Sequence, residues 1–266
     1  MRLAPRHALA AIVAASILVL TGCAGSGTGV RASQISEEGP LSTPAGVTAG
    51  HAGRSAPLPP ATATTAPEPA GLPGVGPGTA AEVPANARQA VLVTGVGADS
   101  ATATARLYSY DDSAGWVPAG PAWPAHNARD GWTDDHHAGD LRSPVGVFGL
   151  TDAGGALADP GTKLTYDHAP VGFSVGGTGF EGEPLEGSFD YVIAINYNRE
   201  PGTSPRDWTR PLGESKGGGI WLHVDHGGPT HGCVSLPATV MKTLLRTLDP
   251  AQHPVVVMGD ATALAR

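Results

Sequence analysis

Hydrophobic and polar positions alternate along short stretches of the chain after residue 88, and this pattern predicts β-strands. Residues 102–108 alternate between small or apolar side chains and polar ones, a period of two that is typical of a half-buried strand. Apolar runs at 90–96, 145–150, 189–197, 219–224 and 254–258 predict further strands, and residues 111–115 carry a turn signal. We therefore expect a mostly-β domain.

One segment has helical spacing instead. Its apolar residues recur three or four positions apart, at Val240, Leu244, Leu245 and Leu248. Pro237 stands at the first turn, where a missing N–H is tolerated, and residues 249–250 (Asp-Pro) end the pattern. The domain is thus predicted to contain one clear helix among many short strands.

The first 22 residues have a different pattern. A basic start with Arg2 and Arg6 precedes an apolar run at 8–20. This run is shorter than the roughly 20 residues that a membrane-spanning helix needs, and it is typical of a signal peptide. Residues 20–23 (Leu-Thr-Gly-Cys) then resemble the bacterial lipobox, which implies a diacylglyceryl group on Cys23. We expect an exported protein, lipid-anchored to the outer face of the cytoplasmic membrane; the alternative is a plain secretory signal.

Composition separates a tether from a domain. All fourteen aromatic residues lie at or after Tyr108, whereas the preceding segment is rich in Pro, Ala, Thr and Gly. A segment of this kind cannot bury enough apolar surface to fold. We predict a signal peptide at 1–22, a disordered tether at 23–86 and a folded domain at 87–262. With 16 basic and 24 acidic residues the formal charge is −8, which argues against a nucleic-acid partner.

Reactive side chains concentrate at residues 220–237, which hold three histidines, one aspartate and Cys233. If Cys23 carries a lipid, Cys233 has no disulfide partner. A turn centred on Gly228 would place His223 opposite Cys233, five residues away on either side. Such a pair predicts an activated thiol of lowered pKa, with the amides of Gly232 and Cys233 as an oxyanion hole.

His223 followed by residues 230–234 (Thr-His-Gly-Cys-Val) resembles the active-site signature of L,D-transpeptidases, bacterial envelope enzymes that remodel peptidoglycan. Residues 139–148 and 190–199 resemble further segments of the family's actinobacterial members. The resemblance covers about residues 88–262. It implies a β-sandwich with one or two short helices, Cys233 as the acylated nucleophile and His223 as the general base.

The resemblance also implies a substrate and its contacts. The thiol would take a tetrapeptide stem of peptidoglycan and pass it to an amine, which makes a 3–3 cross-link; carbapenem-type β-lactams would be covalent inhibitors, and no cofactor or metal is expected. The residues expected to bind substrate or the oxyanion are Gly232, His231, Ser235, Tyr197 and Asn198. The His-to-Cys spacing of ten is shorter than in the commonest motif. Ser235 stands where many members carry Arg or Asn, which leaves the donor peptide open.

Several alternatives remain open at this point. Hydrolysis of the thioester would make the protein an L,D-carboxypeptidase, and a non-catalytic wall-binding lipoprotein would keep the fold with a buried structural cysteine. His226 is a rival base, expected on the opposite face from His223, and Asp225 is expected to be a solvated turn acid or to orient an imidazole. Ser174 lies in a Gly-x-Ser-x-Gly match, but no helix is predicted to follow it. A zinc site could draw on His136, His137, His223, Asp225, His226, His231 and Cys233.

Overall fold

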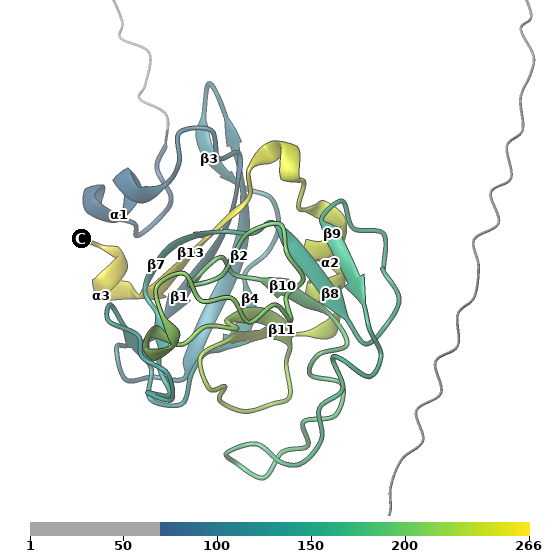
Figure 1. Ribbon diagram of the computed structural model, residues 1–266. Helices are drawn as coiled ribbons and strands as arrows, with labels where there is room; N and C mark the ends of the chain where they lie inside the picture. Colours follow the sequence, from purple (N-terminus) through teal and green to yellow (C-terminus); the bar gives the residue numbers. More distant parts are fainter. Residues whose placement is uncertain (1–69) are drawn as a thin grey trace, which may run out of the picture. The chain divides into compact units, whose positions relative to one another are not determined.

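Eleven strands join into one curled sheet, in the order β7-β13-β1-β2-β4-β12-β11-β10-β8-β9, with β3 paired to β2 (Figure 1). The computed structural model describes residues 70–266. The predicted signal peptide, the lipidation site at Cys23 and the tether up to residue 69 lie outside the described residues. The prediction of a mostly-β domain with a few short helices is confirmed.

The main sheet and a two-stranded sheet formed by β5 and β6 contain all the strands of residues 70–266. The strands are β1 (Gln89–Gly95), β2 (Thr102–Asp111), β3 (Gly115–Pro118), β4 (Trp123–His126), β5 (Trp132–Thr133), β6 (Ser143–Pro144), β7 (Gly146–Gly149), β8 (Asp152–Gly155), β9 (Thr165–His168), β10 (Val192–Ala194), β11 (Trp221–Val224), β12 (Val234–Leu236) and β13 (Val255–Asp260). The helices are α1 (Pro77–Glu82), α2 (Ala238–Thr247) and α3 (Ala261–Leu264), with 3-10 turns η1 (Glu214–Lys216) and η2 (Pro250–Gln252). Within this part of the chain no helix is long and apolar enough to cross a membrane.

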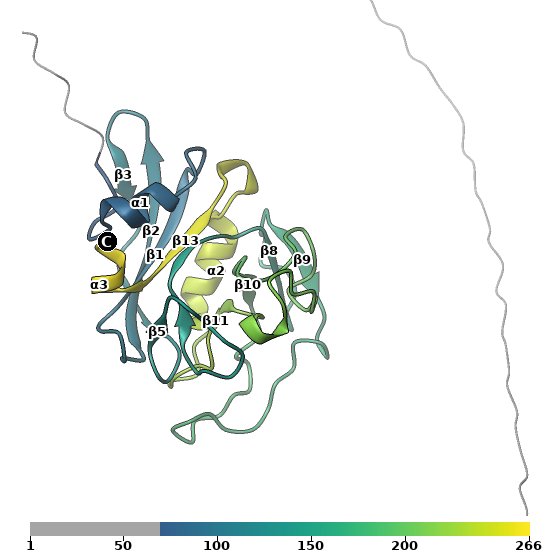
Figure 2. The ribbon, with the colours of Figure 1, turned by 60° about the vertical axis from the view of Figure 1, so that its left-hand side comes forward.

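The main core lies inside the curl of the sheet, where α2 packs between strands β1, β2 and β13 and strands β8, β10 and β11 (Figure 2). The apolar face of α2 supplies Val240, Met241, Leu244 and Leu245, all buried, as the helical spacing predicts. Alternate residues of the strands complete this core, because successive side chains of a strand point to opposite faces. This packing fixes β11 and β12, which carry the candidate site.

The outer face of the β1–β13 pair is also buried, and this moves the expected domain boundary. Ala90 and Leu92 on that face pack with Leu72 and with Leu264 of α3. The amides of Gly76 and Gly78 donate to the carbonyls of Leu264 and Arg266, both at 2.8 Å. The prediction that the tether runs to residue 86 and the domain ends at 262 is therefore wrong at both ends for the described residues. Residues 70–86 and 263–266 belong to the folded unit, because they cover an apolar face that would otherwise meet water.

Most predicted strands are present, but the one expected at 189–197 is much shorter. Only Val192–Ala194 forms β10. A turn precedes it, with the Asp190 amide donating to the Gly187 carbonyl at 3.0 Å, and another follows, with the Tyr197 amide donating to the Ile195 carbonyl at 2.7 Å. Asn198 then takes φ +43, a left-handed conformation that asparagine tolerates better than most residues. These turns direct the following segment across the site.

Candidate active site

Strands β11 and β12 run parallel, so the hairpin expected about Gly228 is not formed. His223 lies opposite Ser235, and Leu222 lies opposite Val234. The intervening residues leave the sheet as a loop, whose Thr230 forms a bridge with Ala128 before the chain enters β12 from the same end as β11. Continued by one residue, the register places Cys233 opposite Trp221. Since strand residues alternate between faces, His223 and Cys233 share a face as diagonal neighbours rather than as an opposed pair.

The Cys233 thiol lies beside main-chain groups of the segment that enters β11. The Trp221 amide donates to Sγ at 3.4 Å, and the thiol donates to the Gly219 carbonyl at 3.6 Å. Burial raises the pKa of Cys233 to about 11, although the Trp221 amide acts in the opposite direction. The expectation of a lowered thiol pKa is therefore wrong for this structure, and the Cys233 thiol is neutral at physiological pH.

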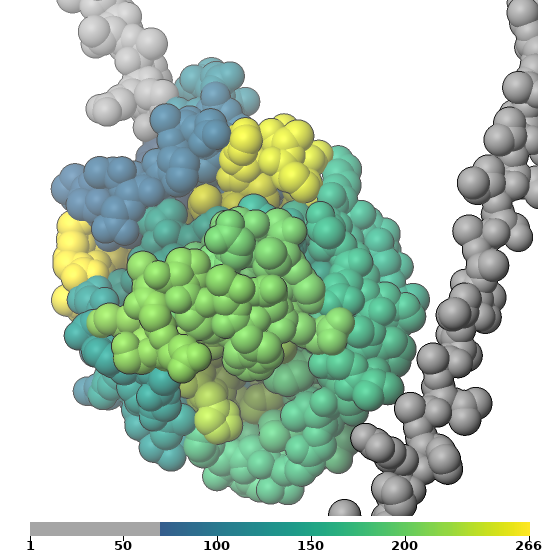
Figure 3. Space-filling view, in the orientation of Figure 1, coloured from purple at the N-terminus to yellow at the C-terminus, as the bar shows by residue number. Residues whose placement is uncertain are grey.

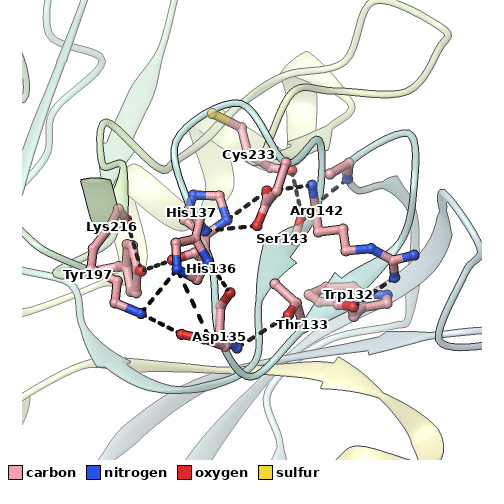
Figure 4. Close-up of polar contacts among 12 residues, drawn as sticks. Trp132, Thr133, Asp135, His136, His137, Arg142, Ser143, Tyr197, Lys216 and Cys233 are labelled. Atoms are coloured by element: carbon pink, nitrogen blue, oxygen red, sulfur yellow. Dashed lines mark hydrogen bonds and ion pairs between the residues drawn. The ribbon is translucent and has the colours of Figure 1, made fainter. Parts of the chain in front are cut away.

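Two hydroxyl groups fix the main chain at Cys233. Thr230 Oγ1 donates to the Cys233 carbonyl at 2.6 Å. Ser143 Oγ donates to the same carbonyl at 3.4 Å (Figure 4). Both residues are buried. The structure thus gives a positioning role to Thr230 of the signature and to Ser143 of the segment at 139–148, which the sequence analysis did not single out.

His223 is buried, at 3% exposure, and burial lowers its pKa to about 4. Its Nδ1 lies 2.9 Å from the Val224 carbonyl. A carbonyl only accepts, so Nδ1 carries the proton and Nε2 of the neutral ring is left as the basic atom. Phe189 meets the ring edge-on, with centroids 5.3 Å apart. His223 is therefore a neutral imidazole of fixed orientation, and it has no hydrogen bond to the thiol within residues 70–266.

The amides of Gly232 and Cys233 donate no hydrogen bond to any group of the described chain. Gly232 is nonetheless buried, and both residues line the cleft that holds the thiol. Unused N–H groups beside a nucleophile can stabilise the oxyanion of a tetrahedral intermediate. The oxyanion hole expected from the sequence at these two amides stays a prediction.

A cleft of about 470 Å³ opens above Cys233. Residues 208–220 form one wall and residues 136–141 the other, with His231, Gly232 and Cys233 between them. In Figure 3 the first wall is part of the lime-coloured segment that lies across the front of the domain. Leu141 in the second wall holds φ +56, a conformation that costs a bulky residue about 1–3 kcal/mol and that is common at ligand sites.

Tyr197 and Asn198, expected to bind substrate, instead hold the first wall from behind. Asn198 Nδ2 donates to the carbonyls of Gly213 and Gly217, at 3.0 and 2.6 Å, and its Oδ1 accepts from the Leu212 amide at 2.7 Å. The Tyr197 hydroxyl donates to the Lys216 carbonyl at 2.9 Å. Neither side chain lines the cleft. Among the expected binding residues only His231 and Gly232 do.

Ser235 is fully buried and lies outside the cleft lining. Its hydroxyl donates to Asp225 Oδ1 at 2.8 Å, and His126 Nδ1 lies 2.9 Å from the same oxygen. Burial would raise the pKa of Asp225, but the hydrogen bonds from His126 and Ser235 outweigh it and lower the pKa. The expectation of a solvated turn acid at Asp225 is wrong, because this carboxylate ties the end of β11 to β12 and β4.

His226 stacks on His223 instead of facing the opposite side. The ring centroids are 5.8 Å apart and the planes differ by 10°. The alternation argument fails here because β11 ends at Val224. His226 Nδ1 in turn lies 3.2 Å from Glu183 Oε1. His226 therefore backs the His223 ring, and Glu183, which the sequence analysis did not single out, reaches it from a distant loop.

The zinc and serine alternatives gain no support from the geometry. Within residues 70–266 no three His, Cys, Asp or Glu side chains come together as a metal site. Ser174 is exposed on a turn that no helix follows. His136 is buried and lines the cleft, with Nδ1 3.0 Å from Asp140 Oδ1, whereas His137 is exposed (Figure 4).

Comparison with known proteins adds little to this geometry. No protein-family model and no curated protein matches the chain. Two solved structures match, both of the helical cell shape determining protein Pgp2 from Campylobacter jejuni, one of them a point mutant. Each is 18% identical at a TM-score of 0.37, and they cover 65% and 67% of this chain. The matched part is 48% and 52% of those chains, so this chain spans about half their length.

Proposed function

We propose that this protein is a cysteine-dependent L,D-transpeptidase of peptidoglycan. The observation that carries the proposal is the thiol of Cys233 in an open cleft, beside the two unused amides of Gly232 and Cys233. The resemblance of residues 223 and 230–234 to the family signature supports a tetrapeptide stem as the substrate. We assign His223 as the base, since its ring is neutral with Nε2 unprotonated and its side chain shares a face of the strand pair with Cys233.

The reaction proceeds through a thioester. His223 Nε2 takes the thiol proton as Sγ attacks the carbonyl carbon before the terminal D-residue, and the two amides hold the oxyanion. The C–N bond then breaks, and the imidazolium returns the proton to the leaving amine of the free D-amino acid. An acceptor amine attacks the thioester, loses a proton to His223 and forms a new amide, and the thiol is regenerated. A water acceptor would give the carboxypeptidase product instead.

Cys233 and His223 are both neutral before substrate binds, and this determines when the thiol ionises. With the Cys233 pKa raised to about 11 and the His223 pKa lowered to about 4, proton transfer in the resting state is unfavourable. The proton moves during attack, when the charge passes on to the substrate oxygen that the amides stabilise. This mechanism protects the thiol while the cleft is empty.

Intact-mass analysis of the protein with a tetrapeptide donor tests the proposal. We expect an adduct on Cys233 with loss of the terminal D-residue, a cross-linked product when an amine acceptor is added, and a β-lactam adduct with a carbapenem. Cys233→Ala abolishes all three. Release of tripeptide without cross-link, at saturating acceptor, would identify the carboxypeptidase; absence of any Cys233 adduct would favour a non-catalytic wall-binding protein.

We also propose the lipid anchor that the sequence indicates at Cys23 and, with it, a position facing the cell wall. Cys23→Ser should release the protein from the membrane fraction or block its processing. If the variant fractionates and migrates as the parent does, the anchor is disproved.

A further inference from the structure

One cation on the cleft wall has no acidic partner. Arg210 lines the cleft together with Cys233. Six other arginines of residues 70–266 form ion pairs with an aspartate, but no carboxylate of this part of the chain lies within 4.0 Å of the Arg210 guanidinium nitrogens. Glu214 is the acidic residue in the lining, and it makes no such pair either. The cleft thus presents a guanidinium that no carboxylate of residues 70–266 contacts directly, although Asp207 acts on its charge from a greater distance.

Arg210 packs against Gly218 and Gly219, and the absence of side chains there leaves room for it. A Cβ at Gly218 would overlap the guanidinium, and a Cβ at Gly219 would lie 3.6 Å from Arg210 Nη2. The carbonyl of Gly219 accepts the hydrogen bond from the Cys233 thiol. The cation and the nucleophile therefore contact the same short glycine segment.

The guanidinium is held in place before any ligand arrives. Its Nη1 donates to the carbonyls of Asp207 and Thr209, at 3.2 and 3.0 Å. Its Cζ lies 4.9 Å from the centroid of the Trp208 ring, which is 74% exposed. Nε and Nη2 donate to no group of residues 70–266. Burial lowers the pKa of Arg210, but a guanidinium stays protonated at any physiological pH.

We infer that Arg210 binds the C-terminal carboxylate of the donor peptide and selects donors with a free C-terminus. This inference rests on the proposed function. In an L–D peptide bond whose D-residue is terminal, the free carboxylate lies two bonds beyond the scissile nitrogen. Every donor therefore carries this carboxylate close to the carbon that Sγ attacks. Arg210 packs against Gly219, whose carbonyl accepts from the thiol, so its guanidinium is placed to meet this carboxylate. A guanidinium with two free donors suits a carboxylate better than a neutral amide.

Two synthetic tetrapeptides test this inference, one ending in a free carboxylate and one in a carboxamide. Binding to full-length Cys233→Ala is measured by calorimetry, so that the result does not depend on turnover. We expect the acid to bind about 10- to 100-fold more tightly than the amide, the range of a charge-assisted hydrogen bond. Adding Arg210→Gln should remove this preference, because the affinity for the acid peptide falls and the affinity for the amide peptide stays unchanged. Arg246→Gln is the matched control, since Arg246 also has no carboxylate partner within residues 70–266 and lies outside the cleft lining.

The outcomes separate this inference from the proposed function. Equal binding of acid and amide, or an acid preference that survives Arg210→Gln, overturns the role of Arg210, even if Cys233 of the parent forms a thioester. An Arg210-dependent acid preference without any thioester supports the carboxylate site and overturns the transpeptidase. If Arg210→Gln lowers the affinity for both peptides equally, Arg210 has a structural role and the inference is also overturned.

Discussion

Glu183 Oε1 lies 3.2 Å from His226 Nδ1, with both side chains nearly buried. A Cβ at either Gly179 or Gly228 would overlap this carboxylate, so the pair is enclosed by two glycines. A second contact lies nearby, where the rings of Phe180 and His231 have centroids 4.6 Å apart. Together these contacts attach the loop at 174–188 to the loop that leads to Cys233, and His226 in turn stacks on the His223 ring.

Glu183→Gln should loosen this attachment. Loss of the carboxylate beside His226 should slow acylation of Cys233 a few-fold, because His226 then packs less firmly against His223, and it should expose the loop to limited proteolysis. Glu186→Gln is the control, because Glu186 lies on the same loop, is exposed and has no ion-pair partner among residues 70–266. If both variants acylate and resist protease as the parent does, the loop attachment has no role in the reaction.

The raised pKa of Cys233 predicts how the thiol responds to pH. A thiol with a pKa of about 11 is almost entirely protonated at neutral pH, so its alkylation by iodoacetamide should rise about tenfold per pH unit up to the highest pH at which the fold survives. The rate at pH 7 should lie far below that of a free cysteine. A plateau below pH 8 would instead reveal a preformed thiolate–imidazolium pair and contradict the neutral resting state.

The two stacked histidines should differ in their effect on chemistry. His223→Gln should lower the acylation rate by about 10²- to 10⁴-fold, the usual contribution of a general base. His226→Gln should lower it much less, since the His226 ring packs against His223 and its Nδ1 lies beside Glu183. Circular dichroism of both variants controls for folding. If His226→Gln is inactive while His223→Gln retains nearly full activity, the assignment of the base is reversed.

Removing residues 70–86 should destabilise the domain. This segment buries Leu72 and packs Val75 and Val83 against the outer face of the β1–β13 pair. Burial of these side chains should contribute about 3 kcal/mol or more to the free energy of unfolding. A chain that starts at residue 87 should therefore melt roughly 6–12 °C below one that starts at residue 70. Leu72→Ala in the longer chain should reproduce part of this loss. Equal melting temperatures would mean that the segment adds no stability.

The sequence already contained the signal for this boundary. Residues 90–93 are apolar without alternation, and such a run indicates a strand that is buried on both faces. Val91 and Val93 face the main core, whereas Ala90 and Leu92 face the segment at 70–86. The segment has no aromatic residues, and its composition therefore suggests a tether. Leu72 and its small neighbours are nevertheless enough to cover Ala90 and Leu92.

The candidate site was predictable in its residues but not in its register. The signature singles out Cys233 and His223, and the register places both on one face of the β11–β12 pair, but symmetrical spacing about Gly228 fits a hairpin and a parallel return equally well. Only the partner strands decide, since β4 pairs with β12 and β10 pairs with β11. Arg210 could not be found from the sequence, because the path of the irregular segment from Asn198 to Ile220 depends on hydrogen bonds to its main chain.

Those hydrogen bonds have a consequence for how this cleft can change. Asn198 and Tyr197 hold the first wall through the main-chain groups of residues 212, 213, 216 and 217, and the Ala138 amide donates to the Ser215 carbonyl. The wall's shape is thus independent of which side chains stand at Leu212, Glu214 and Ser215. Of these three residues Glu214 lines the cleft, so variation at Glu214 can change what the cleft accepts without a redesign of the scaffold, whether in a library or by natural drift.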